Sequence, residues 1–195
     1  MKKLLTILLI SAVYYNATAG GSYTSAKRIS RAGIDSSRFY KDTIIKWMTI
    51  EEAMAAQQKK PKKIFISFFA TWCGWCRKED AVTYKNREIA HYINQHFYPV
   101  KFNAETKTSV AFKGKTYEFI PDKKIFANAF ATTMLNGKLS YPASVVLDET
   151  GTKIDIHQGY LDPISMEIAL NFTGSNAYKK MKQAQFEEEF YGKIE

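Results

Sequence analysis

The chain of 195 residues has two cysteines, both in the segment Trp72-Cys73-Gly74-Trp75-Cys76. Two thiols at this spacing suit reversible thiol–disulfide exchange, a structural disulfide or half of a metal site. They follow the apolar run 64–69, which predicts a buried strand, and they precede a predicted helix. The first cysteine therefore lies at a helix N-terminus, where unpaired backbone N–H groups and the helix dipole favour a thiolate.

The two structural alternatives are weaker than the redox one. A disulfide across two intervening residues closes a very small loop, so it constrains the unfolded chain little. A chain of this length buries an adequate core without such a bridge. A structural zinc ion needs a full tetrahedral set of ligands, and only His91, His96 and His157 could complete it, none of them near the cysteines in sequence. We therefore expect a redox dithiol, with no metal and no cofactor.

Residues 1–19 have the pattern of a signal peptide. Lys2 and Lys3 are followed by an apolar stretch over 4–13 and by the small residues 17–19. The apolar stretch is shorter than the roughly 20 residues of a membrane-spanning helix. We expect cleavage near Gly20 and a periplasmic or secreted protein. An uncleaved segment that anchors the chain in the membrane is the alternative.

The chain carries 28 Lys and Arg against 19 Asp and Glu, a formal net charge of +9. The densest basic run, residues 59–63, falls between a predicted helix end and a strand start, where cations are expected on dipole grounds. The basic residues form no concentrated pattern of the kind that binds nucleic acid, so no nucleic-acid partner is expected.

The rest of the chain reads as a flexible leader over 20–41 and a single α/β domain over 42–195. Strands and helices alternate at its start, which favours parallel pairing with right-handed crossovers. Thr49 and Glu52 form a capping box at the first helix. The predicted strands are 44–48, 64–69, 97–102, 143–147 and 153–157, with a hairpin over 110–119. The predicted helices are 49–60, 77–96 with a break near 90, 124–135, 163–172 and 176–190.

These pieces resemble the thioredoxin superfamily over roughly residues 42–173. The residues that carry the resemblance are Phe68-Phe69-Ala70-Thr71-Trp72-Cys73-Gly74-Trp75-Cys76, Tyr141-Pro142-Ala143, Asp148-Glu149-Thr150-Gly151 and Gly159-Tyr160. A Cys-x-x-Cys pair at a strand-to-helix turn, with a proline before a later strand, is much more specific than the pair alone. The chain is most similar to exported members of the superfamily, which carry an extra hairpin before the proline.

The resemblance implies a central mixed sheet of four to five strands flanked by helices. The resemblance also implies a hairpin-like insertion before a cis-proline loop. We expect an extra C-terminal helix as well. It implies a cis peptide bond between Tyr141 and Pro142, in a loop that lies against the dithiol. Tyr141 would then contact a bound substrate chain through its backbone.

The resemblance also implies a protein-disulfide oxidoreductase. Cys73, expected to be the more exposed thiol with a lowered pKa, attacks a protein or peptide disulfide, and Cys76 resolves the mixed disulfide. Trp72, Gly74 and Trp75 surround the dithiol and offer an apolar surface to extended substrates. We expect a reductase supplied by a membrane thiol electron donor. A disulfide oxidase or isomerase, and a chaperone-like binding module without redox turnover, are the alternatives, and the oligomeric state is left open.

One departure from the resemblance concerns proton transfer. Thioredoxins carry a buried aspartate six positions before the first cysteine, and here that position is Ser67. A hydroxyl is a poor general base at neutral pH. The nearest carboxylates in sequence are Glu79 and Asp80, one helical turn beyond Cys76, and they are the candidates for proton handling.

Overall fold

The computed structural model describes residues 44–194. The predicted signal peptide (1–19) and the predicted leader (20–41) lie outside these residues. The elements in chain order are α1 (Ile50–Lys59), β1 (Lys63–Phe69), α2 (Gly74–Val82), α3 (Arg87–His96), β2 (Phe97–Asn103), β3 (Val110–Phe112), β4 (Lys115–Tyr117), β5 (Phe119–Ile120), β6 (Ala127–Asn128), α4 (Ala129–Met134), β7 (Ala143–Leu147), β8 (Lys153–Gln158), α5 (Pro163–Gly174), the 3₁₀ turn η2 (Ala177–Lys179) and α6 (Gln183–Glu189).

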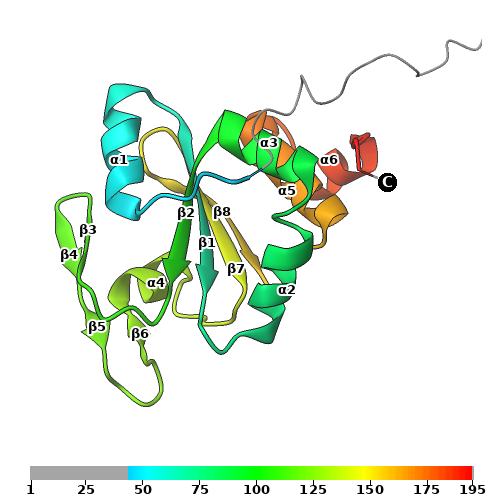
Figure 1. The fold of residues 1–195 in the computed structure, drawn as a ribbon. Coiled ribbons are helices and arrows are strands. Elements are labelled where there is room, and N and C mark those ends of the chain that lie inside the picture. The colour runs from blue at the N-terminus through cyan, green and yellow to red at the C-terminus, as the bar shows by residue number, and fades with distance from the viewer. Residues whose placement is uncertain (1–43, 195) are drawn as a thin grey trace, which may run out of the picture. The chain divides into compact units, whose positions relative to one another are not determined.

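The main sheet has four strands in the order β2-β1-β7-β8. Strand β1 pairs parallel with β2 and antiparallel with β7, and β7 forms a hairpin with β8. Helices lie on both sides of the sheet, with α1 and α4 on one side and α3 and α5 on the other (Figure 1). The mixed α/β fold with a four-stranded central sheet is therefore confirmed.

Each face of the sheet has its own core, because side chains alternate along a strand. Ile64, Ile66 and Phe68 of β1 pack with residues of α1 and α4. Phe65, which points the other way, packs with residues of α3 and α5. Full burial of a large apolar side chain contributes about 2 kcal/mol. The two cores therefore hold β1, and the cysteines that follow it, in a rigid frame.

The first predicted strand, residues 44–48, is wrong. Only Met48 forms a bridge, parallel to Val100 of β2. The preceding backbone pairs with a side chain instead, because Asn94 of α3 accepts a hydrogen bond from the N–H of Lys46 at 3.0 Å and donates one to the carbonyl of Ile44 at 2.9 Å. The side chain of Asn94 thus pairs with a backbone N–H and a backbone carbonyl, and it takes the place of the neighbouring strand that a sheet would supply.

The capping box at α1 is confirmed, with Glu52 and Thr49 each accepting the other's backbone N–H. The predicted break in the helix after the cysteines is also present, but it falls earlier than expected. Helix α2 ends at Val82, and Asn86 caps the start of α3 by accepting two backbone N–H groups. The cysteine-bearing helix is therefore a short, separate element.

The segment between β2 and β7 contains the predicted hairpin, β3–β4, whose turn residues Lys113 and Gly114 both have positive φ. The predicted helix over 124–135 is wrong in its first half. Residues 119–128 instead form a second hairpin, β5–β6, and Asp122 closes a tight turn in its loop by accepting the backbone N–H of Lys124 at 2.7 Å. Helix α4 begins only after Asn128, which caps it.

A C-terminal helix is present, but the single helix predicted over 176–190 is wrong. Asn176 has φ of 67°, a left-handed conformation that cannot continue a helix, and its side chain accepts a hydrogen bond from buried Lys63 at 3.0 Å. The chain therefore makes the 3₁₀ turn η2 before α6 begins at Gln183. A long-range contact to β1 overrides the local helix propensity.

Among residues 44–194 no helix has both the length and the apolar character to span a membrane.

Candidate functional site

Cys73 and Cys76 lie where β1 passes into α2, and they form a disulfide. Cys73 occupies the N-cap position of α2, and its Sγ accepts a hydrogen bond from the backbone N–H of Cys76 at 3.0 Å. This N–H is one of the unpaired donors at the helix N-terminus, so it favours negative charge on the Cys73 sulfur. The backbone of the turn itself is held by the N–H of Cys73, which donates to the carbonyl of Ala70 at 3.1 Å.

The expectation that Cys73 is the more exposed cysteine is wrong for this disulfide form. Both residues are 3 % exposed, and they pack with Ala70, Phe69 and Tyr141. In the disulfide form, apolar side chains therefore shield both cysteines from solvent.

Two exposed tryptophans stand beside the disulfide and make different contacts. Trp72 is 66 % exposed, packs edge-on against Tyr141 and donates its indole N–H to Glu105 at 2.8 Å. Trp75 is 57 % exposed and packs against Tyr160, with the Lys78 ammonium 4.7 Å from its ring centre. Exposed rings held in place by such contacts offer apolar area at little cost in side-chain entropy.

The peptide bond between Tyr141 and Pro142 is cis. The carbonyl of Pro142 accepts the N–H of Gly159 at 2.8 Å, which ties this loop to the end of β8. A small cavity of about 270 Å³ opens there, lined by Trp75, Tyr141, Pro142, Gly159 and Tyr160. Tyr141 and Pro142 therefore lie close to the dithiol, as the resemblance implied. Tyr160, which carried part of the resemblance, was not among the predicted site residues but lines this cavity.

Glu79 lies on the same face of α2 as Cys76, one turn further along, and is only 2 % exposed. Its carboxylate accepts the backbone N–H of Leu161 at 3.2 Å. Burial raises the pKa of Glu79 to about 7, against the lowering effects of that hydrogen bond, of Tyr84 and of Lys101. A carboxyl group with such a pKa exchanges protons at neutral pH.

Asp80 differs from Glu79 in exposure and in partner. It is on the exposed side of α2 and forms an ion pair with the Lys101 ammonium. The same ammonium donates to the hydroxyl of Ser67 at 3.2 Å, because Ser67 and Lys101 are opposite each other in the β1–β2 register. The structure thus connects Ser67, where thioredoxins carry an acid, to Asp80 through a lysine.

Lys101 and Tyr84 are site residues that the sequence did not predict. Lys101 had a signal, since it is a charged residue within the apolar strand β2, opposite the polar Ser67 of the equally apolar β1. Tyr84 had none, because it follows α2 in a loop. Its ring packs on Trp47 and Phe65, and burial above all raises its pKa well above the ordinary value for tyrosine.

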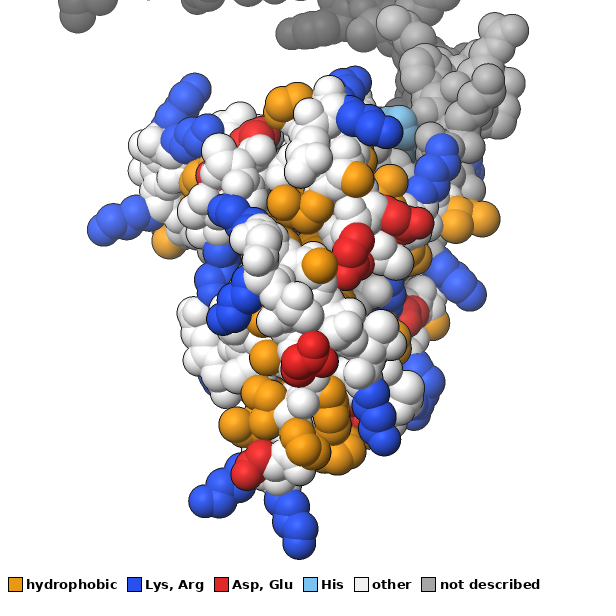
Figure 2. All heavy atoms as spheres, turned by 90° about the vertical axis from the view of Figure 1, so that its left-hand side faces the viewer, with side chains coloured by type: hydrophobic (Ala, Val, Ile, Leu, Met, Phe, Trp, Pro, Cys, Tyr) orange, Lys and Arg blue, Asp and Glu red, His pale blue; other side chains and the backbone are white. Residues whose placement is uncertain are grey.

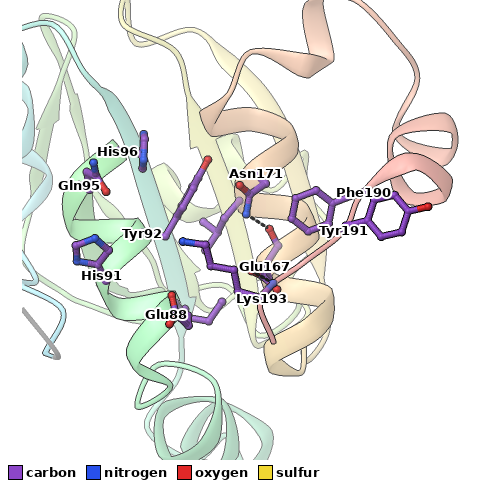
Figure 3. A pocket seen from close by; sticks show the side chains of 12 residues that line it. Glu88, His91, Tyr92, Gln95, His96, Glu167, Asn171, Phe190, Tyr191 and Lys193 are labelled. Carbon is purple, nitrogen blue, oxygen red and sulfur yellow. Dashed lines mark hydrogen bonds between the residues drawn. The ribbon is translucent and has the colours of Figure 1, made fainter. Parts of the chain in front are cut away.

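Two other features lie away from the dithiol. Exposed Ile125 and Phe126 lie in the loop at the tip of the β5–β6 hairpin. Figure 2 shows apolar side chains gathered toward the lower end of the face that it draws. A cavity of about 250 Å³ lies between α3, α5 and the C-terminal segment, where Tyr92, Glu167 and Lys193 line it (Figure 3). Among the described residues, no group of three or more His, Cys, Asp or Glu side chains is arranged to hold a metal ion.

A central mixed sheet with a Cys-x-x-Cys pair at the β1–α2 turn, facing a cis-proline loop, defines a thioredoxin-like protein. Residues 50–174 match the Thioredoxin-like domain family. The chain is also 30 % identical over 177 residues to the Thioredoxin-like protein YneN of Bacillus subtilis, covering 87 % of this chain and 97 % of that one. The chain therefore belongs to the thioredoxin-like domain family.

A solved structure with a TM-score of 0.50 agrees on the fold. A thioredoxin from Thermus thermophilus has a TM-score of 0.50 and 12 % identity, over 66 % of this chain and 86 % of that chain. A thioredoxin-fold protein from Helicobacter pylori has a TM-score of 0.47 and 20 % identity, over 78 % and 92 % of the two chains. A thioredoxin-like fold that carries a Cys-x-x-Cys pair is consistent with thiol–disulfide oxidoreductase activity.

Proposed function

We propose that this protein reduces disulfides in protein or peptide substrates outside the cytoplasm, by dithiol–disulfide exchange through Cys73 and Cys76. The observation that carries the proposal is the Cys73–Cys76 disulfide at the N-terminus of α2 in a thioredoxin-like domain. The reversible bond between these residues is the chemical group that accepts or donates the two electrons of the exchange.

The reaction proceeds in two exchanges. The Cys73 thiolate of the reduced protein attacks one sulfur of a substrate disulfide, so a mixed disulfide forms and the other substrate sulfur leaves as a thiolate. Cys76 then loses its proton and attacks the Cys73 sulfur. The bond between Cys73 and substrate breaks, the second substrate thiolate leaves and takes a proton from water, and the Cys73–Cys76 disulfide forms.

Glu79 accepts the proton of Cys76 in this proposal, and Asp80 does not. Glu79 shares the buried face of α2 with Cys76, and its pKa of about 7 suits proton exchange. Asp80 is held in an ion pair with Lys101. The Asp80 carboxylate is thus already engaged by an ammonium group on the exposed side of α2, whereas Glu79 is buried.

The substrates are extended protein segments in this proposal. The exposed rings of Trp72 and Trp75 and the cavity beside Tyr160 and the Tyr141–Pro142 loop offer apolar contacts next to the sulfur that is attacked. The base of the β5–β6 hairpin, unlike its tip, lies near the same site, since Ala104 donates its N–H to the carbonyl of Phe69 and accepts the N–H of Asn128, the last residue of β6.

Two further observations support the reductive direction of the exchange and the location of the protein outside the cytoplasm. The segment between β2 and the cis-proline loop consists of short hairpins and the six-residue α4, and an oxidase-type helical domain is absent from this described segment. The pattern of residues 1–19 supports export, and an exported reductase requires an electron donor, for which a membrane thiol protein is the proposed source.

Reduction of insulin disulfides with dithiothreitol as the electron source tests the proposal. We expect turnover by the wild-type protein, loss of turnover in Cys73→Ser, and mixed disulfides with substrate trapped by Cys76→Ser. Absence of any thiol–disulfide exchange in the wild type would contradict the proposal and support a binding module. Equilibration with glutathione decides the direction, since reductants of this fold lie near about −270 mV and strong oxidants near about −120 mV.

A further inference from the structure

The hydroxyl of Tyr84 is, among the described residues, the one buried side-chain oxygen or nitrogen without a hydrogen-bond partner. Its ring is held by Trp47, with ring centres 5.1 Å apart, and by Phe65 at 6.3 Å. The Lys101 ammonium lies 4.7 Å from the ring centre. Buried hydroxyl groups normally have partners, so an unpaired one in a rigid setting calls for an explanation.

The groups that face this hydroxyl come from three elements. Glu79 and Asp80 of α2 and Ser67 of β1 all act on Tyr84, and Glu79 and Ser67 are its two hydrogen-bonding neighbours. Lys101 of β2 is already engaged with Ser67 and Asp80. The Tyr84 hydroxyl is thus a donor placed between two acceptors, with neither bond fully formed.

We propose that Tyr84 is a positioning residue that donates its hydroxyl hydrogen bond to Glu79 when Glu79 is ionised and to Ser67 when Glu79 is protonated. This inference rests on the proposed role of Glu79 in the exchange reaction. The proton moves from the Cys76 thiol to the Glu79 carboxylate, the Cys76 thiolate attacks Cys73, and Tyr84 keeps its own proton throughout.

The physical reason is the cost of a buried charge. Glu79 accepts one backbone N–H, from Leu161, which leaves an ionised carboxylate poorly compensated in an apolar setting. A donor that turns toward Glu79 only in the charged state stabilises that state selectively. Burial raises the pKa of the Tyr84 hydroxyl, so the group remains a donor over the whole range in which Glu79 titrates.

The first test measures release of substrate thiol from a preformed mixed disulfide on Cys73 as a function of pH, in the wild type and in Tyr84→Phe. Loss of the Tyr84 donor raises the pKa of Glu79. The free energy of a hydrogen bond to a charged group corresponds to a change of about one unit in that pKa. We expect the midpoint, near pH 7 in the wild type, to rise by about that much. The rate at neutral pH then falls about fivefold, and the rate near pH 9 is unchanged.

Two further variants give the test a control and an opposite expectation. Tyr92→Phe removes a hydroxyl from a half-buried tyrosine on α3, away from the dithiol, and leaves the midpoint unchanged. Ser67→Ala removes the competing acceptor, so Tyr84 binds Glu79 more fully and the midpoint falls. An unchanged midpoint in Tyr84→Phe, or an equal loss of rate at every pH, overturns the inference.

A second measurement separates this inference from the proposed function. The carboxyl carbon of Glu79, followed by NMR in the reduced protein, reports its ionisation whether or not the protein has exchange activity. We expect Tyr84→Phe to raise this ionisation midpoint and Tyr92→Phe to leave it in place. If the midpoint does not respond to Tyr84→Phe, the coupling is absent even in an active enzyme. If it responds in a protein without exchange activity, the coupling holds and the proposed function fails.

Discussion

Two buried glutamates of this fold, Glu79 and Glu167, differ in their hydrogen-bond partners and in their roles. Glu79 on α2 is 2 % exposed and Glu167 on α5 is 7 % exposed. The carboxylate of Glu167 accepts the backbone N–H of Lys193 at 2.8 Å on one oxygen and that of Ile194 at 3.1 Å on the other. Figure 3 shows Glu167 beside this C-terminal segment. Glu79 accepts a single backbone N–H, from Leu161.

The difference lies in how fully the backbone compensates each charge. Glu167 has a donor for each oxygen, so its carboxylate acts as a clasp that holds the C-terminal segment against α5. Glu79 lacks the second backbone donor, and burial therefore raises its pKa to about 7. A fully compensated buried carboxylate serves structure, whereas an undercompensated one is available for proton transfer.

The largest effect that tests this comparison is on catalysis. Glu79→Gln keeps the size of the side chain and removes its basicity, so we expect the resolution step at neutral pH to slow about a hundredfold, as for loss of a general base. Glu167→Gln is the matched control and is expected to keep the wild-type rate. Stopped-flow measurement of thiol release gives both rates. Equal rates in wild type and Glu79→Gln would remove Glu79 from the mechanism.

The next effect is on the pH dependence of stability. The folded-state pKa of Glu79, about 7, is above the ordinary glutamate value of 4.5, so the folded protein binds the proton more tightly than the unfolded chain. Stability contributed by the protonated group is therefore lost as pH rises through this window. Relative to Glu79→Gln, the wild type should lose about 2 kcal/mol between about pH 5 and pH 7. Urea unfolding at a series of pH values measures this loss, and a constant difference would contradict it.

A smaller effect is expected at the clasp. The amide of Glu167→Gln has one acceptor oxygen where the carboxylate has two, so one of the N–H groups of Lys193 and Ile194 loses its partner. We expect a loss of about 1 to 2 kcal/mol and faster proteolysis of the C-terminal segment. Limited proteolysis with mass spectrometry detects the release. Protection equal to that of the wild type would show that apolar contacts alone hold the segment.

The smallest effect concerns the space beside the clasp. A Cβ atom at Gly192 would lie 2.5 Å from one carboxylate oxygen of Glu167. Gly192→Ala therefore requires the segment to shift, and we expect a loss of about 1 kcal/mol with no change in the exchange rate. Gly114→Ala on the β3–β4 turn is a useful comparison, because the added Cβ there meets no neighbour and only the positive φ is strained. A change in exchange rate in Gly192→Ala would mean that the two regions are coupled.

Local rules predicted most of the fold. The apolar run of β1, the capping box at Thr49 and the hairpin at Lys113–Gly114 were all predictable, because each depends on neighbouring residues. The three segments whose secondary structure was predicted wrongly share another cause. Residues 44–48, 124–128 and 176–182 take their conformations from Asn94, from the turn closed by Asp122 and from the contact between Asn176 and Lys63. A single polar side chain decides each of them, and no periodicity in the sequence shows it.

For the site, the sequence determined the dithiol and the turn that carries it, because spacing and residue type are enough to specify them, and the resemblance to thioredoxins added the loop of Tyr141 and Pro142. It also showed that Ser67 replaces the usual acid, and it left Glu79 and Asp80 equivalent. The tertiary structure decided between them, since adjacent residues on a helix face different surroundings. One is buried between Leu161 and Tyr84, and the other meets a lysine from β2. The pKa of a carboxyl group depends on that surrounding, which only the folded chain creates.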